Sequence, residues 1–274
     1  MRSRWLEELT TPEVEAYFAR GGKTAFLPVG AVEMHGPHQP IGTDTLVGKA
    51  FALRLAEATD GIVLPEMHYT WAGSTDGFPG TISIDPGLVT PVVEAVLLRA
   101  HRMGFSRLIV LSIHAPHNWI LALTVRRFFE KHHIPAVFAN PYNPLSKEVA
   151  AMLSGEREQG KEASLVLAAL KILGKEALYS EAEMCREEQA PPLPASFNQI
   201  LPLTVGYFMQ DPRQHACPSK HISLAAGLEF IDAQVKLITP RIAAIDRYTE
   251  EIHEQWNQGW TAAENHDSPA PPAP

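Results

Sequence analysis

Residues 30–45, GAVEMHGPHQPIGTDT, hold four side chains that can bind a metal ion or transfer a proton: Glu33, His35, His38 and Asp44. Prolines and glycines are interspersed among them, which predicts a fixed loop rather than a helix. If extended geometry continues through Glu33 and His35, a carboxylate and an imidazole point to the same side, and that pair suits zinc, manganese or iron. Asp44 can return to the same point and bridge two cations about 3.5–4 Å apart. The alternative is a polar surface loop in which Thr43 or Asp44 caps the next helix.

A second polar group follows residues 106–113, SRLIVLSI, a run that predicts a buried strand. The run leads directly into His114, and His117 follows three residues later. Parallel strands present their carboxyl ends at one edge of a sheet, so we expect His114 to meet the side chains of residues 33–44 there. Without that second cluster, a histidine after an apolar run is more often a hydrogen-bonded core residue.

Glu162 stands near the start of a later helical stretch, residues 160–173. The helix dipole alone favours a carboxylate in a first turn, so this position does not by itself indicate a ligand. Glu162 becomes a candidate ligand if its helix begins at the same edge of the sheet as the other polar groups.

The surrounding elements are expected to form an α/β fold. Short apolar runs that predict strands occur at residues 24–29, 61–65, 106–113 and 136–139. Helical spacing occurs at residues 5–19, 46–58, 85–103, 119–131, 160–173 and 223–249. This alternation predicts a mostly parallel sheet with helices on both faces, in a single domain covering residues 1–266. Residues 267–274, DSPAPPAP, have the composition of a disordered tail. Residues 179–206 are weakly patterned and proline-rich, as expected of a crossing over the site or an oligomer contact.

Composition excludes several classes of function. The 274 residues carry a net charge of −8 and no basic patch, so we expect no nucleic-acid partner. No apolar run reaches the roughly 18 residues of a membrane span. Two cysteines and no signal peptide at the first residues fit a reducing cytoplasm. Twelve histidines are a high count and favour a metal site.

Two segments resemble the signature of the creatininase family of metal hydrolases. Residues 27–45 resemble its G-x-x-E-x-H-G-P-H-L-P-x-x-T-D pattern, and residues 78–83, FPGTIS, match a second family segment. The resemblance implies a three-layer α/β/α sandwich, often assembled as a homo-oligomer of six chains. It also implies one or two divalent ions (Zn, Mn or Fe) and hydrolysis of C–N bonds in small cyclic amides or formamides. By position, the implied metal ligands are Glu33, His35, Asp44 as the bridge, His114 and Glu162.

The chain also departs from the family pattern. Residues 112–118, SIHAPHN, replace a glycine-rich N-G-H-G-G-N segment, and Pro116 stands where some members place a metal-binding glutamate. His117 is a candidate replacement ligand. Residues 157–159 replace the family's H-A-G, and residues 73–77 lack a Glu-His pair that many relatives carry. These differences predict a retained metal scaffold and an altered substrate-binding shell.

The expected activity is hydrolysis of a C–N bond in a small-molecule substrate by a metal-activated water. Glu162 or His117 is expected to deliver a proton to the leaving nitrogen, and His38 to orient a ligand. Asp76 and Trp119 are candidate outer or substrate contacts. The alternatives are a formamide deformylase, a peptidase acting on a short tail, and a degenerate member that binds a ligand without turnover.

Overall fold

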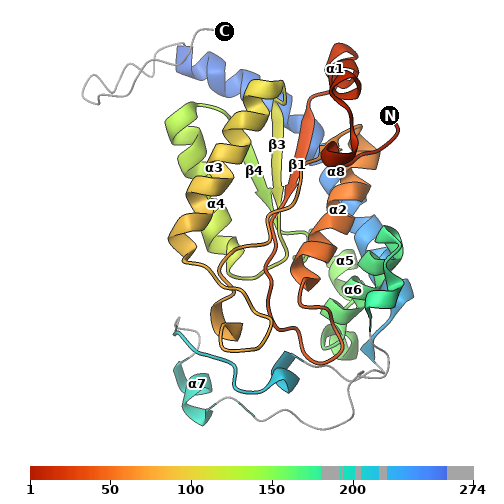
Figure 1. The fold of residues 1–274 in the computed structure, drawn as a ribbon, viewed down its shortest axis with the longest axis vertical. Helices are drawn as coiled ribbons and strands as arrows, with labels where there is room; N and C mark the ends of the chain where they lie inside the picture. The colour runs from red at the N-terminus through yellow and green to blue at the C-terminus, as the bar shows by residue number, and fades with distance from the viewer. Residues whose placement is uncertain (180–191, 193, 201–204, 216–220, 258–274) are drawn as a thin grey trace, which may run out of the picture.

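The computed structural model describes residues 1–179, 192, 194–200, 205–215 and 221–257. Its centre is a parallel four-stranded sheet in the order β2-β1-β3-β4. Figure 1 shows β1, β3 and β4 side by side. The strands are β1 (Thr24–Pro28), β2 (Ile62–Val63), β3 (Arg107–Leu111) and β4 (Ala136–Ala139). The predicted parallel sheet is confirmed, and the expected disordered tail lies outside the described residues.

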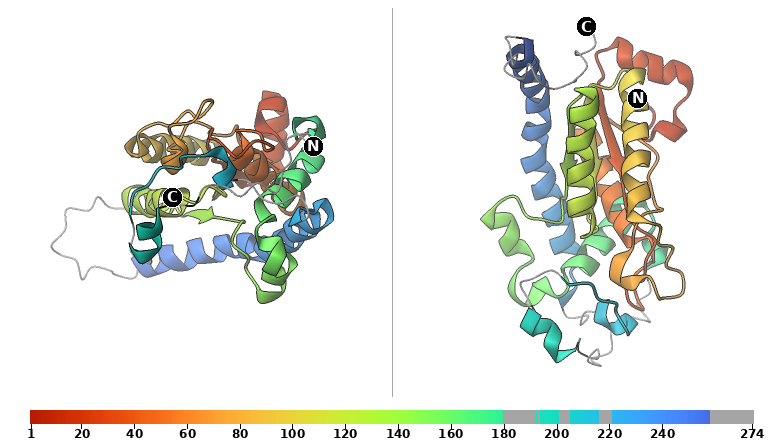
Figure 2. Two further views of the ribbon diagram at one scale, coloured as in Figure 1. Left: turned by 90° about the horizontal axis from the view of Figure 1, so that it is seen from below. Right: turned by 90° about the vertical axis from the view of Figure 1, so that its left-hand side faces the viewer.

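Helices cover both faces of the sheet, as the two perpendicular views show (Figure 2). Phe26, Val63 and Ile109 point to one face, where they pack against α2 (Thr43–Thr59), α6 (Lys161–Leu173) and α8 (Leu224–Asn257). Leu27 and Val110 point to the other face, towards α1 (Thr11–Ala19), α3 (Pro86–Met103) and α4 (His117–His132). This alternation along strands buried on both faces produces the expected three-layer α/β/α architecture.

Shorter elements complete the described chain. They are η1 (Leu6–Glu8), η2 (Gly73–Thr75), α5 (Lys147–Met152), η3 (Gly155–Glu158), η4 (Glu176–Leu178), α7 (Ala195–Ile200) and η6 (Pro212–His215). None of the described helices is both long and apolar enough to cross a bilayer.

The helix predicted over residues 5–19 begins later than its spacing suggests. The Thr10 backbone N–H donates to the Glu13 carboxylate at 2.8 Å, and Pro12 stands in the first turn of α1. Both features fix a helix start at Thr11. Upstream, Trp5 forms a parallel bridge with Val63 at the sheet edge. The helical spacing of residues 5–19 is therefore divided between the 3-10 helix η1 (Leu6–Glu8) and α1, because the cap at Thr10 and the sheet pairing of Trp5 interrupt it.

The strand order reverses direction at β1. From β1 the chain adds β2 on one side and then β3 and β4 on the other. In open α/β sheets, ligands bind outside the carboxyl ends of the strands where this reversal occurs. That crevice lies between the segments that follow β1 and β3, which carry Glu33 and His114.

Residues 205–215, here called the strap, lie at the end of the molecule towards which the strands point (Figure 1, blue-green). The Met209 backbone N–H donates to the Ser74 carbonyl at 2.8 Å and joins the strap to the loop that contains η2. The strap therefore lies at the same end of the sheet as the polar clusters.

Candidate metal centre

A tight approach between β1 and α2 brings Asp44 back to the segment that follows the strand. A Cβ atom at Gly30 would collide with Thr45, so only glycine allows the first turn of α2 to pack this closely. The Glu33 backbone N–H donates to the Ile41 carbonyl at 2.9 Å and closes the intervening loop. Asp44 consequently sits in the first turn of α2, buried, beside the end of β1.

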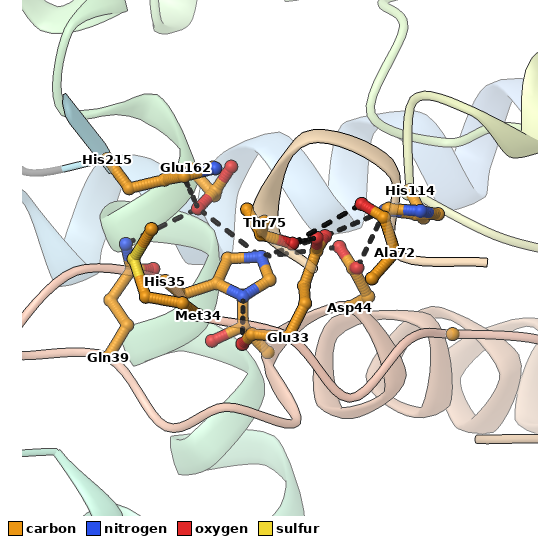
Figure 3. Close-up of polar contacts among 12 residues, drawn as sticks. Glu33, Met34, His35, Gln39, Asp44, Ala72, Thr75, His114, Glu162 and His215 are labelled. Atoms are coloured by element: carbon orange, nitrogen blue, oxygen red, sulfur yellow. Dashed lines mark hydrogen bonds and ion pairs between the residues drawn. The ribbon is translucent and has the colours of Figure 1, made fainter. Parts of the chain in front are cut away.

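Glu33, Asp44 and His114 form the first cluster, drawn in Figure 3. His114 Nδ1 lies 2.9 Å from Glu33 Oε1 and 3.0 Å from Asp44 Oδ2. One ligand atom from each of the three residues falls within 4.8 Å of the others, and all three side chains are buried. Two carboxylates and an imidazole at this spacing form a donor set for a divalent ion.

His35 lies on the other side of Asp44 (Figure 3). Its Nε2 atom is 3.6 Å from Asp44 Oδ1, 3.8 Å from Glu162 Oε1 and 4.0 Å from Glu33 Oε1. These separations are too long for hydrogen bonds. Asp44 therefore turns one oxygen towards His114 and the other towards His35, which is the arrangement of a bridging carboxylate.

Each of these two imidazoles has one nitrogen held by a backbone carbonyl. His114 Nε2 lies 2.9 Å from the backbone carbonyl oxygen of Trp71, and His35 Nδ1 lies 3.0 Å from the backbone carbonyl oxygen of Glu33. A carbonyl can only accept, so each of these nitrogens carries a hydrogen. The remaining nitrogen of each ring faces carboxylates, which also only accept when ionised. Stable packing therefore requires a cation there, either a second proton or a metal ion.

The pKa values show the same demand for positive charge. Burial lowers the pKa of His35, but the surrounding carboxylates, Asp44 first, outweigh it and raise it to about 10. Burial also opposes protonation of His114, yet Asp44 and Glu33 raise its pKa to about 10. Burial raises the pKa of Asp44, but the two imidazoles hold it well below its usual range. A divalent ion can take the place of these protons, so the residues present fit a metal.

Glu162 begins α6 at this same edge, which meets the geometric condition set by the sequence. Its Oε1 atom accepts a hydrogen bond from Gln39 Nε2 at 3.3 Å and lies close to His35. The side chain is 28% exposed, unlike those of the first cluster. It therefore lies between the buried carboxylates and solvent.

The other candidate residues lie around this group. His117 is fully buried, with Nδ1 2.8 Å from Ser112 Oγ and its ring edge-on to His114 at 4.7 Å. Burial lowers its pKa to about 3. His38 is buried with its ring edge-on to Tyr179. Asp76 is exposed at the end of η2, and Trp119 is 68% exposed at the start of α4. The roles expected of these four residues in proton transfer, ligand orientation and substrate contact stay predictions.

Three side chains that contact the centre were not predicted from the sequence. Gln39 holds Glu162, as described above, and Thr75 Oγ1 donates to Glu33 Oε2. His215, at the end of the strap, places Nδ1 3.9 Å from Glu162 Oε1, and burial lowers its pKa. Gln39 lies within residues 30–45, the loop that holds Glu33 and Asp44, so a role at the site could have been predicted for it. Thr75 and His215 each end a single turn of 3-10 helix, which is too short to leave a periodic pattern in the sequence.

Comparison with known proteins identifies similar sequences. The creatininase family model, described as creatinine amidohydrolase, matches residues 7–201. Creatinine amidohydrolase of Pseudomonas putida is 35% identical over 125 residues, covering 44% of this chain and 48% of that enzyme. The mycofactocin precursor peptide peptidase of Mycolicibacterium smegmatis is 34% identical over 108 residues, covering 36% of this chain and 42% of that protein. Each match thus spans less than half of the curated relative.

Solved structures share the fold over most of the chain. A structure of creatinine amidohydrolase (creatininase) superposes with a TM-score of 0.68 at 25% identity, covering 88% of this chain and 97% of that one. A manganese form of creatininase gives a TM-score of 0.67 at 25% identity, with coverages of 88% and 98%. A zinc–zinc form of a creatininase mutant gives 0.66 at 24% identity, with the same coverages.

Proposed function

Because the chain belongs to the creatininase family, we propose that it is a metal-dependent hydrolase of a C–N bond in a small molecule. The bond is an amide, a cyclic amide or a formamide, and the attacking group is a metal-activated water. Metal ions described for the similar structures support a divalent cation of the same class, manganese or zinc, and iron suits the same ligand types.

One observation carries this proposal: Asp44 stands between two imidazoles whose outer nitrogens are held by backbone carbonyls. Such outer hydrogen bonds fix the tautomer of a metal-binding histidine and aim its free nitrogen at the ion. Glu33, Asp44 and His114 would hold the first ion, and His35 with Asp44 would contribute to a second. When bound, a divalent ion lowers the pKa of water towards about 7 and polarises a carbonyl.

The protein's own residues supply proton transfer and orientation. Glu162 is the partly exposed carboxylate next to the buried cluster, and its Oε1 atom faces His35. Its other oxygen can therefore take the proton of the attacking water and give it to the leaving nitrogen. His117 suits this task less, because its ring is fully buried and its Nδ1 faces Ser112. The Thr75 hydroxyl fixes Glu33, and the Gln39 amide fixes Glu162.

The space beside Glu162 favours a small substrate. A polar pocket of about 190 Å³ is lined by Gln39, Tyr142, Glu158, Gln159, Glu162, Ala163, Gln214 and His215. Sites for drug-sized ligands typically span ~300–1,000 Å³, so this pocket suits a small molecule or the end of a longer one. Amide and carboxylate groups in its wall suit a polar substrate that donates hydrogen bonds.

A second candidate function is a peptidase acting on a short peptide end. It is favoured by the similarity to the mycofactocin precursor peptide peptidase, although that match covers 42% of the relative. In that case the scissile bond would be a peptide bond, and the terminal residue of the peptide would occupy the polar pocket beside Glu162.

The test combines metal content with a substrate panel. Purified wild-type protein and Glu33→Gln are loaded with Zn²⁺ or Mn²⁺ and measured by elemental analysis. Cyclic amides, formamides and short peptides are then assayed for ring opening, formate release and amino-acid release. We expect bound metal and turnover in the wild type, and in the variant less bound metal and no turnover. Failure of the wild type to bind metal would overturn the proposal and favour a degenerate ligand-binding member.

A further inference from the structure

The strap brings a third imidazole to the centre. His215 Nδ1 lies 3.9 Å from Glu162 Oε1, and His35 Nε2 lies 3.8 Å from the same oxygen. The rings of His35 and His215 are 5.1 Å apart at an interplanar angle of 46°. Two segments distant in sequence thus converge on one carboxylate oxygen of a third (Figure 3).

These separations match the coordination of an ion better than direct contact. Nitrogen and oxygen atoms 3.8–3.9 Å apart do not form hydrogen bonds. Atoms that bind one zinc ion at about 2.0–2.2 Å lie roughly 3–4 Å from each other, and two imidazoles on it place their ring centres roughly 5 Å apart. The observed distances fall in these ranges.

We propose that His215 is a ligand of a second divalent cation, which it binds together with His35, Glu162 and the bridging Asp44. This inference rests on the proposed metal-dependent function and adds a ligand from a part of the chain beyond the family match. The ligand set of the second ion is complete only when the strap lies over the crevice. Binding of this ion and docking of the strap are therefore linked.

The strap has the internal contacts needed to position a ligand. Arg213 donates to both carboxylate oxygens of Asp211, at 2.9 and 2.7 Å. Gln214 Oε1 accepts the backbone N–H of Gln210 at 2.9 Å. With the Met209–Ser74 hydrogen bond, these contacts fix the turn that ends at His215. Glu162 is oriented from the other side by Gln39.

The experiment measures metal binding rather than turnover. Metal-free wild type, His215→Ala and His215→Gln are titrated with Zn²⁺ by calorimetry, and the bound equivalents are checked by elemental analysis. Phe208→Ala is the matched control, because that strap side chain is 66% exposed. We expect two equivalents in the wild type and in Phe208→Ala. In both His215 variants we expect the second equivalent to bind at least tenfold more weakly.

Hydrogen exchange supplies a second readout. Amides of residues 205–215 are expected to exchange more slowly when the wild type binds its second equivalent, and to show no such change in His215→Ala. Equal second-site affinity in wild type and variants, or a wild type that binds one equivalent, would overturn the role of His215 while leaving the hydrolase proposal standing. A wild type that binds no metal would overturn both.

Discussion

The two ends of the sheet pair their carboxylates with different kinds of positive group. At the amino end, Lys23 precedes β1 and Arg107 begins β3, and both pair with Asp246 of α8. Arg107 meets that carboxylate through two hydrogen bonds of 2.8 and 2.7 Å. At the carboxyl end, Glu33, Asp44 and Glu162 are paired with histidines instead.

The difference lies in whether the positive charge is permanent. A guanidinium or ammonium group keeps its proton at neutral pH, so the amino end is a closed ion pair that links α8 to the sheet. An imidazole can release its proton, and the nitrogen then becomes a ligand. The amino end therefore contributes stability, whereas the carboxyl end can exchange protons for a metal ion.

The largest effect is expected from Asp44→Asn, which removes the charge shared by the two imidazoles. Loss of several kcal/mol of transition-state stabilisation corresponds to a fall in kcat/KM of about 10³-fold. Activity and bound metal are measured together, with Asp246→Asn as the matched control at the other end of the sheet. If Asp44→Asn kept wild-type activity in metal-free buffer, the statement that the carboxyl end acts by holding a metal ion would be wrong.

Removal of the metal ion should lower thermal stability, because the ion stabilises the carboxyl end of the sheet. An ion that binds only the folded chain at 100 times its Kd adds about 2.7 kcal/mol, or roughly 5–10 °C in Tm for a chain of this size. Thermal unfolding with Zn²⁺ and with a chelator should show this shift in the wild type and a smaller shift in Glu33→Gln, which lacks a ligand of the first ion. Equal shifts in both proteins would mean that the ion binds elsewhere.

A smaller effect is expected from Thr75→Val, which removes the hydroxyl that donates to Glu33 and keeps the side-chain shape. Outer partners of metal ligands typically contribute 10–100-fold in affinity. Zn²⁺ titration of the variant should show that loss at the first equivalent. The matched control is Thr59→Val at the last residue of α2, where the hydroxyl donates to the Leu55 carbonyl, and it should leave affinity unchanged.

The smallest effect is expected at the amino end. Asp246→Asn should reduce the free energy of unfolding by about 1–2 kcal/mol without changing metal content. Hydrogen bonds from Arg107 lower the pKa of Asp246, so its contribution is complete above the unfolded value of about 3.9 and is lost as the pH falls through the folded pKa. Denaturant unfolding at neutral pH and near pH 3 should show the gap between the two proteins closing. If the difference in free energy of unfolding between the two proteins were the same at both pH values, the ion pair of Asp246 would not be its source.

Much of the centre could be predicted because it lies next to regular elements. Glu33 and His114 follow buried strands, and Asp44 and Glu162 open helices, so topology alone brings them to one edge. Thr75 and His215 could not be predicted, because the single 3-10 turns that carry them are too short to show a periodicity from which a position follows. The Trp71 and Glu33 carbonyls that fix the imidazoles are backbone groups, and residue type does not reveal them.

The distance along the chain between the partners has a kinetic consequence. Glu33 meets Thr75 across 42 residues, and Gln39 meets Glu162 across 123. Parallel strands need long crossover connections, and such non-local contacts form late in folding. A bound ion therefore cannot nucleate this fold. It acts after the sheet has assembled, so it should slow unfolding and leave the refolding rate nearly unchanged.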